Sequence, residues 1–266
     1  MRATFRTALL ILPLMATMLL GACATAPDAS DAEAVADFKA TNDPLEPLNR
    51  AVYEINDGID VVILRPLALA YRSVVPDPAR QGVRNVLDNL AAPVVLANDM
   101  MQGKPKRAGD TLMRLVINST LGVAGLFDVA TGMGYPQHSS DFGMTLAVWG
   151  LVDGGPYLML PLFGPSTVRD GVGLGVDTIA DPFSYGRNAA LHPKLAAKAG
   201  IFGAGVIDLR SRIIDAGGDK VLADSLDEYA TIKSAYLQRR QNLIFDGAPP
   251  LDDEDELPLA PAAPPQ

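Results

Sequence analysis

The sequence predicts a mainly or entirely α-helical fold, and two observations support that prediction. First, Asp77-Pro78 places a capping side chain before a proline at the first helical position, which is typical of a helix start. Apolar residues then recur at the spacing of one helix face. They are Val83, Val86, Leu87, Leu90 and Val94. Second, strand signals are few, because only residues 61–64 and 157–160 form short apolar runs with Pro or Gly nearby.

The first helix is expected to begin at residues 43–46, Asp-Pro-Leu-Glu. Asp43 has the position of a capping residue, with proline at the first helical position and Glu46 at the third. Residues 111–118 are apolar nearly all round, interrupted only by Arg114, and predict a further helix.

Two helix starts are expected in the second half of the chain. Ser166 and Thr167 precede Asp170 at a spacing that is typical of a cap followed by an acidic residue in the first turn. Ser225 with Glu228 has the same spacing, and an apolar series follows it. The predicted helices therefore extend to the last quarter of the chain.

The first 22 residues have the layout of a lipoprotein signal peptide. Arg2 and Arg6 precede an apolar stretch over residues 8–20, and the small residues Gly21 and Ala22 follow. Cys23, the only cysteine of the chain, comes next, as in a bacterial lipobox. The alternative is a plain cleavage site with an incidental cysteine. Lipidation of Cys23 by about three acyl chains would make the membrane anchor effectively permanent, and the absence of aspartate after it favours the outer membrane.

The mature chain divides into three parts. Residues 23–41 are rich in Ala and Asp and are expected to be a tether, whereas residues 42–246 hold the helical signals. Residues 247–266 combine many prolines with an acidic run, a composition that cannot bury a core and predicts a disordered tail.

Composition excludes several classes of function. A formal charge of −9 and a pI near 4.7 argue against nucleic-acid binding, which needs a basic face. One cysteine and two histidines argue against a disulfide framework and a metal site, and no cofactor motif is present.

Residues 138–141, His-Ser-Ser-Asp, contain the residue types of a hydrolase triad, but adjacency does not give triad geometry. A loop is favoured there. Residues 171–175 fail the dinucleotide pattern, and close packing at the glycines is favoured instead. The chain is therefore not expected to be an enzyme.

Residues 59–207 are rich in apolar segments with few charges and several prolines, yet no run of 18 or more apolar residues occurs. Two interpretations remain open. The segment forms either a compact globular core with exposed lid helices, or helices that lie within one bilayer leaflet and expose apolar faces to acyl chains.

Residues 42–50, Asn-Asp-Pro-Leu-Glu-Pro-Leu-Asn-Arg, resemble the opening signature of the MlaA (VacJ) family of outer-membrane lipoproteins. Further matches follow in order at Val75-Pro76-Asp77-Pro78, Asn118-Ser119-Thr120-Leu121-Gly122, Asp141-Phe142-Gly143-Met144-Thr145-Leu146 and Leu160-Pro161-Leu162-Phe163-Gly164-Pro165-Ser166-Thr167-Val168-Arg169-Asp170. The resemblance covers residues 42–186 and, less distinctly, the helices to about Asp246. Residues 53–56 are less aromatic than in many relatives, and the acidic tail departs from the pattern.

The resemblance implies an all-α, ring-like arrangement of short amphipathic helices in one membrane leaflet, with a central channel. It implies an outer-membrane lipoprotein in the periplasm-facing leaflet that removes mislocalised phospholipids from the outer leaflet. The lipids would pass to a periplasmic phospholipid-binding carrier, and a trimeric porin would be a partner. Two alternatives remain, namely a structural lipoprotein that binds porins without moving lipid, and a lipid hydrolase.

Several residues of the family motifs are expected to have a channel or partner role. They are Asn49, Arg50, Arg65, Arg114, Ser166, Arg169 and Asp170, and Arg72 is a similar candidate. An arginine in so apolar a region needs a partner or solvent. Arg169 is therefore expected either to pair with a carboxylate or to face a lipid phosphate.

Overall fold

The computed structural model describes residues 43–182 and 195–249, and these residues form helices and one two-stranded sheet. The mainly helical prediction is confirmed. Cys23, the signal peptide, the tether and most of the acidic tail lie outside the described residues, as do residues 183–194.

The described part of the chain begins with one long helical segment that changes its winding in the middle. α3 (Glu46–Ile59) continues into a π-helical turn, η1 (Asp60–Leu64), and then into α4 (Arg65–Val74). The strand predicted over residues 61–64 is therefore wrong. A short β-branched run cannot be assigned by periodicity alone, and here neighbouring helices on both sides extend through it. Arg210 of α11 (Leu195–Asp215) binds both carboxylate oxygens of Asp60 at 2.7 Å, which fixes the start of this turn.

The next segment forms a pair of contacting helices. α5 (Asp77–Met101) continues through Pro93, and α6 (Pro105–Thr120) follows a turn at Gly103. Gly103 has a φ of +67°, a conformation that favours glycine. A short helix, α7 (Val129–Gly132), packs against α6. Both predicted helices are confirmed here, although Pro76 and not Asp77 holds the capping position of α5.

The central segment combines α8 (Phe142–Val148), the strands β1 (Tyr157–Leu160) and β2 (Gly164–Thr167), and α9 (Val168–Ala180). The strands are antiparallel, with Tyr157 opposite Thr167. The strand predicted over residues 157–160 and the helix start at Thr167 are confirmed, since the Thr167 side chain accepts a hydrogen bond from the backbone N–H of Asp170.

Two shorter helices follow α11 in the described residues, namely α12 (Gly218–Ala223) and α13 (Glu228–Ile244). The helix predicted from Ser225 is confirmed, but its cap is Asp227, whose carboxylate accepts a hydrogen bond from the N–H of Ala230. The capping role predicted for Asp43 is also wrong. Leu45 holds the capping position of α3 without a side-chain bond, and Asp43 is instead buried among side chains from distant segments.

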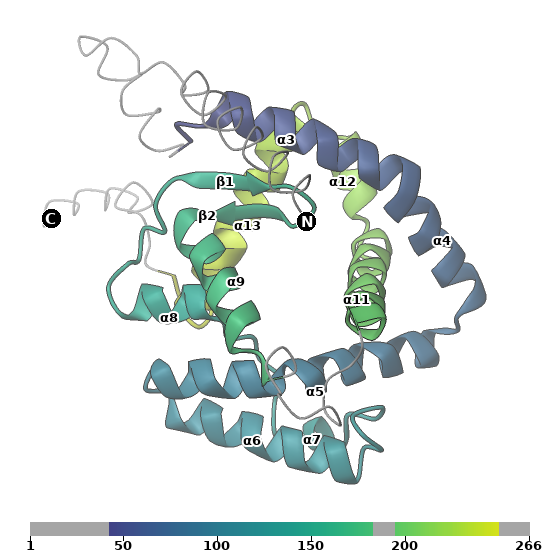
Figure 1. Cartoon of the computed structure of the whole chain (residues 1–266), viewed down its shortest axis with the longest axis vertical. Helices are drawn as coiled ribbons and strands as arrows, with labels where there is room; N and C mark the ends of the chain where they lie inside the picture. The colour runs from purple at the N-terminus through teal and green to yellow at the C-terminus, as the bar shows by residue number, and fades with distance from the viewer. Residues whose placement is uncertain (1–42, 183–194, 250–266) are drawn as a thin grey trace, which may run out of the picture.

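Figure 1 shows α3, α4, α5 and α9 following one another around the middle of the molecule, with α11 beside α4. The contacts between elements run in a closed circuit. α11 joins α4 to α5, α5 touches α8, and α8 packs on α9, while the hairpin joins α9 to α3. Two apolar clusters lie on the hairpin side of this circuit. One contains Met144, Ala147 and Ile244, and the other contains Tyr157, Met159 and Tyr229.

Candidate functional site

The described residues bury more polar than apolar side chains. Sixteen buried residues are polar or charged, whereas eleven are apolar, and five of those eleven are alanines. At the same time, thirty-three large apolar residues are exposed. Buried charges are costly unless they are paired, so the partners of the buried polar residues define the candidate sites.

Asn49 joins α3 to the first strand. Its side-chain amide donates to the carbonyl oxygen of Tyr157 at 3.0 Å and accepts from the backbone N–H of Met159 at 2.9 Å. It also donates to Asp43 at 2.8 Å. Because Asn49 is only 2% exposed, all of these bonds lie away from solvent. The side chain therefore fixes the position of α3 along the strand.

Arg50 lies at the end of the molecule where α3 meets α13. Its Nε lies 2.7 Å from Glu46, and its two terminal nitrogens contact both oxygens of Asp227, the closer pair at 2.6 Å. The guanidinium also lies 4.5 Å from the ring centre of Tyr229, which favours a cation–π interaction. The hydrogen bond from Arg50 is the largest factor that lowers the pKa of Asp227.

Arg169 and Asp170 form the centre of a buried ion network at the start of α9. Arg169 donates to the carbonyl oxygens of Leu151 and Val152 and pairs with Asp170 at 2.9 Å. Arg240 of α13 binds Asp170 through two nitrogens. Burial alone would raise the pKa of Asp170, but hydrogen bonds from these two arginines lower it to about 2. Of the two roles expected for Arg169, the structure shows the ion pair.

Two other expected residues lie at different places. Ser166 is buried beside this network in β2, and its hydroxyl donates to the carbonyl oxygen of Thr167 at 3.2 Å. Arg65, at the start of α4, lies 3.2 Å from Asp219 and is half exposed. Five of the seven expected residues thus share the α3, hairpin, α9 and α13 region, whereas Arg65 and Arg114 do not.

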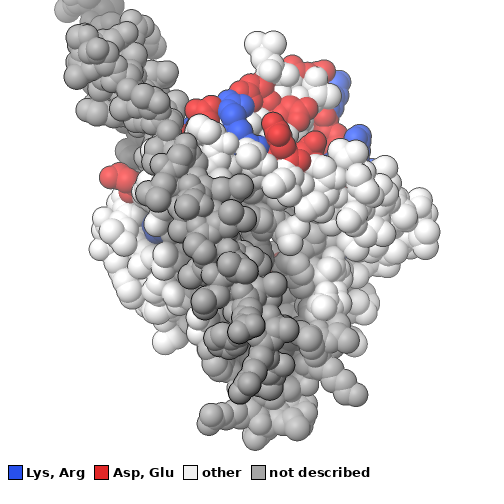
Figure 2. All heavy atoms as spheres, turned by 45° about the horizontal axis from the view of Figure 1, so that its top comes forward, with Lys and Arg blue, Asp and Glu red and all other residues white. Residues whose placement is uncertain are grey.

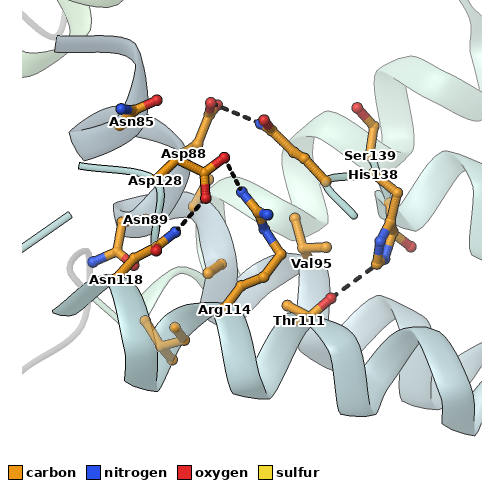
Figure 3. Close-up of a pocket in the computed structure, with 15 residues that line it drawn as sticks. Asn85, Asp88, Asn89, Val95, Thr111, Arg114, Asn118, Asp128, His138 and Ser139 are labelled. Carbon is orange, nitrogen blue, oxygen red and sulfur yellow. Dashed lines mark hydrogen bonds and ion pairs between the residues drawn. The ribbon is translucent and has the colours of Figure 1, made fainter. Parts of the chain in front are cut away.

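Arg114 lines a polar cavity of about 230 Å³ between α5, α6 and the chain over residues 128–140. Figure 3 shows the side chains of Arg114 and Asn118 pointing toward Asp128. Arg114 lies 3.1 Å from Asp128 and donates to Thr131 at 2.8 Å. Burial would raise the pKa of Asp128, but hydrogen bonds from Thr131, Asn118 and Arg114 lower it. The charge of Arg114 is therefore compensated inside the cavity.

His138 lines the other end of this cavity. Its Nε2 lies 2.8 Å from the buried carboxylate of Asp99 and 3.3 Å from the hydroxyl of Thr111. The neighbouring Ser140 hydroxyl accepts a hydrogen bond from Gln102 at 2.8 Å. Residues 135–141 have no helix or strand, as predicted. In the described part of the chain, no hydrogen bond joins His138 to a serine.

An apolar groove of about 390 Å³ lies between α5 and α11. Its walls come from Gly82, Val83, Val86, Leu87, Leu90, Leu126, Gly200, Ile201 and Ala204. A ligand cavity typically has about 300–1,000 Å³ and mostly apolar walls. The groove therefore has room for part of an apolar chain.

A cluster of arginine and aspartate side chains lies between α4, α5 and α11, and we call it the arginine cluster. It consists of Tyr71, Arg72, Asp77, Arg80, Arg84, Asp208, Ser211, Arg212 and Asp215. Arg72 and Arg80 approach Asp215 at 2.6 and 2.9 Å, and Arg84 lies 3.1 Å from Asp208. No sequence pattern predicted this cluster, although the spacing of Arg80 and Arg84 on one helix face could have indicated it.

Exposed apolar side chains occur on most of the described elements, and charged side chains gather at one end of the face drawn in Figure 2. Exposed apolar residues include Val62 at 74%, Val74 at 78%, Leu162 at 62% and Phe163 at 57%. Figure 2 shows acidic and basic side chains gathered at the end that lies uppermost in Figure 1, and a described surface nearly free of charge below it. Exposed charges of α3, α12 and the start of α13 are Glu54, Asp57, Lys220 and Glu228.

Two kinds of feature are absent from the described residues. No helix within residues 43–182 and 195–249 is both long and apolar enough to cross a membrane. Over the same ranges, no group of three His, Cys, Asp or Glu side chains is placed to hold a metal ion.

Exposed apolar patches of this extent mark surfaces that contact other apolar material. The fold and its sites thus define a class of helical proteins with a polar, ion-paired interior and an apolar exterior. The family model of the MlaA lipoprotein matches residues 41–243, and the chain belongs to this family.

Known relatives agree with the family match. The chain is 36% identical over 216 residues to the intermembrane phospholipid transport system lipoprotein MlaA of Escherichia coli, covering 79% of this chain and 82% of that protein. The protein of the same name from Haemophilus influenzae is 28% identical over 250 residues, covering 91% and 92% of the two chains. A solved structure that concerns maintenance of bacterial outer membrane lipid asymmetry superposes with a TM-score of 0.66 at 35% identity. That match covers 76% of this chain and 98% of the other.

Proposed function

We propose that this protein is an outer-membrane lipoprotein that removes mislocalised phospholipids from the outer leaflet. It would pass them to a periplasmic carrier for retrograde transport and so maintain lipid asymmetry. The observation that carries the proposal is the apolar exterior around an ion-paired interior. The relatives named as phospholipid transport lipoproteins support it.

The cost of moving a phospholipid through water explains why such a protein is needed. Two acyl tails of about 16 carbons each would cost about 25 kcal/mol to expose, at roughly 0.8 kcal/mol per CH₂. A passage must keep the tails against apolar walls and give the head group a polar path. The circuit of amphipathic helices around the middle of the molecule is suited to enclose such a channel (Figure 1). The protein lowers the free-energy barrier to moving the lipid, and the carriers that accept the lipid downstream set the direction of transport.

The apolar exterior also supports a location in the periplasm-facing leaflet. A helix that lies in a leaflet exposes its apolar face to acyl chains, as exposed Val62 and Leu67 on the η1 and α4 segment would do. The charged end formed by α3, α12 and α13 would then face the periplasm (Figure 2). Lipidation of Cys23 would hold the protein at that membrane.

The proposed partners are phospholipid, a trimeric porin and a periplasmic phospholipid-binding carrier of the same pathway. The expected motif residues would act mainly by holding the circuit of helices together. Asn49, Arg50, Ser166, Arg169 and Asp170 all lie where α3, the hairpin, α9 and α13 meet.

The deciding experiment measures outer-leaflet phospholipid in a strain that lacks its own gene of this family. The strain carries either this gene or an empty vector. We expect less outer-leaflet phospholipid with the gene. Equal levels in both strains would reject lipid removal and leave a structural porin-binding lipoprotein as the alternative. Release of free fatty acid by the purified protein would instead favour a lipid hydrolase.

A further inference from the structure

Four buried polar atoms of the arginine cluster have no hydrogen-bond partner among the described residues. They are the hydroxyls of Tyr71 and Ser211 and the Nε atoms of Arg72 and Arg80. Ser211 is 0% and Arg80 is 7% exposed. Each of these four atoms can donate a hydrogen bond. Leaving a buried donor unpaired costs free energy, so four of them in one cluster indicate a missing acceptor.

The cluster also carries more positive than negative charge. Four arginines (Arg72, Arg80, Arg84 and Arg212) are matched by three aspartates (Asp77, Asp208 and Asp215), which leaves a net charge of +1. Arg72 is the least engaged of the inner arginines, because it contacts one oxygen of Asp215 through one terminal nitrogen. The missing acceptor is therefore expected to be an anion.

The apolar groove lies next to this cluster along the same two helices. On α11, Ile201 and Ala204 of the groove are followed by Asp208 and Ser211 of the cluster at helical spacing. On α5, Arg80 and Arg84 precede Leu87 in the same way. An anion-binding site next to an apolar groove fits an acyl chain that carries an anionic head, and among membrane lipids that head is the phosphate of a phospholipid.

We propose that the arginine cluster binds the phosphate of a phospholipid whose acyl chain lies in the groove between α5 and α11. This inference rests on the proposed function, because it takes phospholipid as the cargo. Guanidinium groups match phosphate oxygens in geometry and charge. The Tyr71 and Ser211 hydroxyls supply further donors to the same phosphate.

The test measures lipid binding to the purified full-length protein in detergent micelles, by competition against a fluorescently labelled phospholipid. The three competitors are dioctanoyl phosphatidic acid, dioctanoylglycerol and inorganic phosphate. The first two differ only in the phosphate, so their comparison isolates its contribution. Inorganic phosphate shows whether the site binds the anion without the acyl chains. We expect phosphatidic acid to compete best.

Two variants test the cluster and one tests the groove. Arg72→Gln should weaken binding of phosphatidic acid about tenfold, the loss of one charge-assisted contact. Tyr71→Phe removes a hydroxyl without a described partner. It should weaken binding of phosphatidic acid by a smaller factor while leaving the fold intact. Neither should change binding of dioctanoylglycerol. Ala204→Phe fills the groove and should weaken binding of both lipids. Arg239→Gln, an exposed arginine of α13, is the matched control.

Unchanged binding of phosphatidic acid in both Arg72→Gln and Tyr71→Phe would overturn the proposal. Equal competition by inorganic phosphate and phosphatidic acid would overturn the role of the groove. The experiments distinguish failure of this binding site from failure of the proposed transport function. If the gene lowers outer-leaflet phospholipid while the variants bind normally, only this site is wrong. If the gene has no effect in cells but the variants lose binding, the site stands and the transport role falls.

Discussion

Asn49 and Asn56 make the same pair of hydrogen bonds, Asn49 to β1 and Asn56 to the end of β1 and the turn that follows it. Asn49 donates to the carbonyl oxygen of Tyr157 and accepts from the N–H of Met159, with distances of 3.0 and 2.9 Å. Asn56 donates to the carbonyl oxygen of Leu160 and accepts from the N–H of Leu162, at 3.0 and 2.8 Å. The two residues lie two turns apart on one face of α3. They therefore align α3 with β1 and with the turn after it.

Asn49→Ala should lower the free energy of unfolding by at least about 2 kcal/mol, because it leaves buried groups of Tyr157, Met159 and Asp43 unpaired. Asn56→Ala is the matched control, since its bonds lie partly in solvent. Its cost should stay below about 1 kcal/mol. Denaturant unfolding in detergent measures both. Equal losses in the two variants would contradict the role of burial.

The carboxylate of Asp170 should make stability depend on acidity. Hydrogen bonds from Arg169 and Arg240 outweigh burial and lower its pKa from the ordinary 3.8 to about 2. A carboxylate whose pKa is lower in the folded than in the unfolded state stabilises the fold at pH values above its unfolded-state pKa. That contribution is lost as the pH falls from about 4 toward 2. Asp170→Asn should therefore be less stable than the natural protein at neutral pH, and the difference should shrink over this range. A constant difference would reject the prediction.

The glycines of α9 should differ sharply in their tolerance of a methyl group. A Cβ on Gly173 would lie 2.4 Å from the backbone nitrogen of Gly143, because α8 and α9 pack closely there. Gly173→Ala should thus be strongly destabilising. A Cβ on Gly175 meets no described atom within 4 Å, so Gly175→Ala should stabilise the helix by up to about 1 kcal/mol. Thermal unfolding in detergent compares the two, and similar shifts would contradict close packing.

Trp149, the only tryptophan of the chain, reports on leaflet burial without a label. Its side chain is 57% exposed and lies next to Phe142, with ring centres 5.9 Å apart. If the apolar exterior contacts acyl chains, phospholipids with brominated tails should quench its fluorescence strongly, whereas aqueous acrylamide should quench it weakly. The opposite order, measured after reconstitution into vesicles, would argue for a surface in water.

Cys23→Ser should abolish lipid attachment, because the thiol is the group that would carry the diacylglycerol. We expect the variant to remain as the uncleaved precursor and to incorporate no labelled palmitate, whereas the natural sequence should be cleaved and labelled. Substitution of Ser30, which lies in the same segment, is the control and should change neither result. Palmitate labelling of the Cys23→Ser protein would reject the lipobox.

The sequence by itself determined the helices whose signals are local. The apolar stripe from Val83 to Val94 predicts α5, and Thr167 with Asp170 predicts the start of α9. Successive residues of these signals are at most four positions apart, about one turn of a helix, so residues close in the sequence are enough to specify them.

Only the tertiary structure decided what the polar residues do. Asp43 has the sequence context of a cap, yet it accepts hydrogen bonds from Asn49 and Tyr229. Arg50 pairs with Asp227, 177 positions further along the chain. The free energy of a buried charge depends on which partner lies within a few ångströms. Helices far apart in the chain supply that partner, and local spacing holds no record of how they pack.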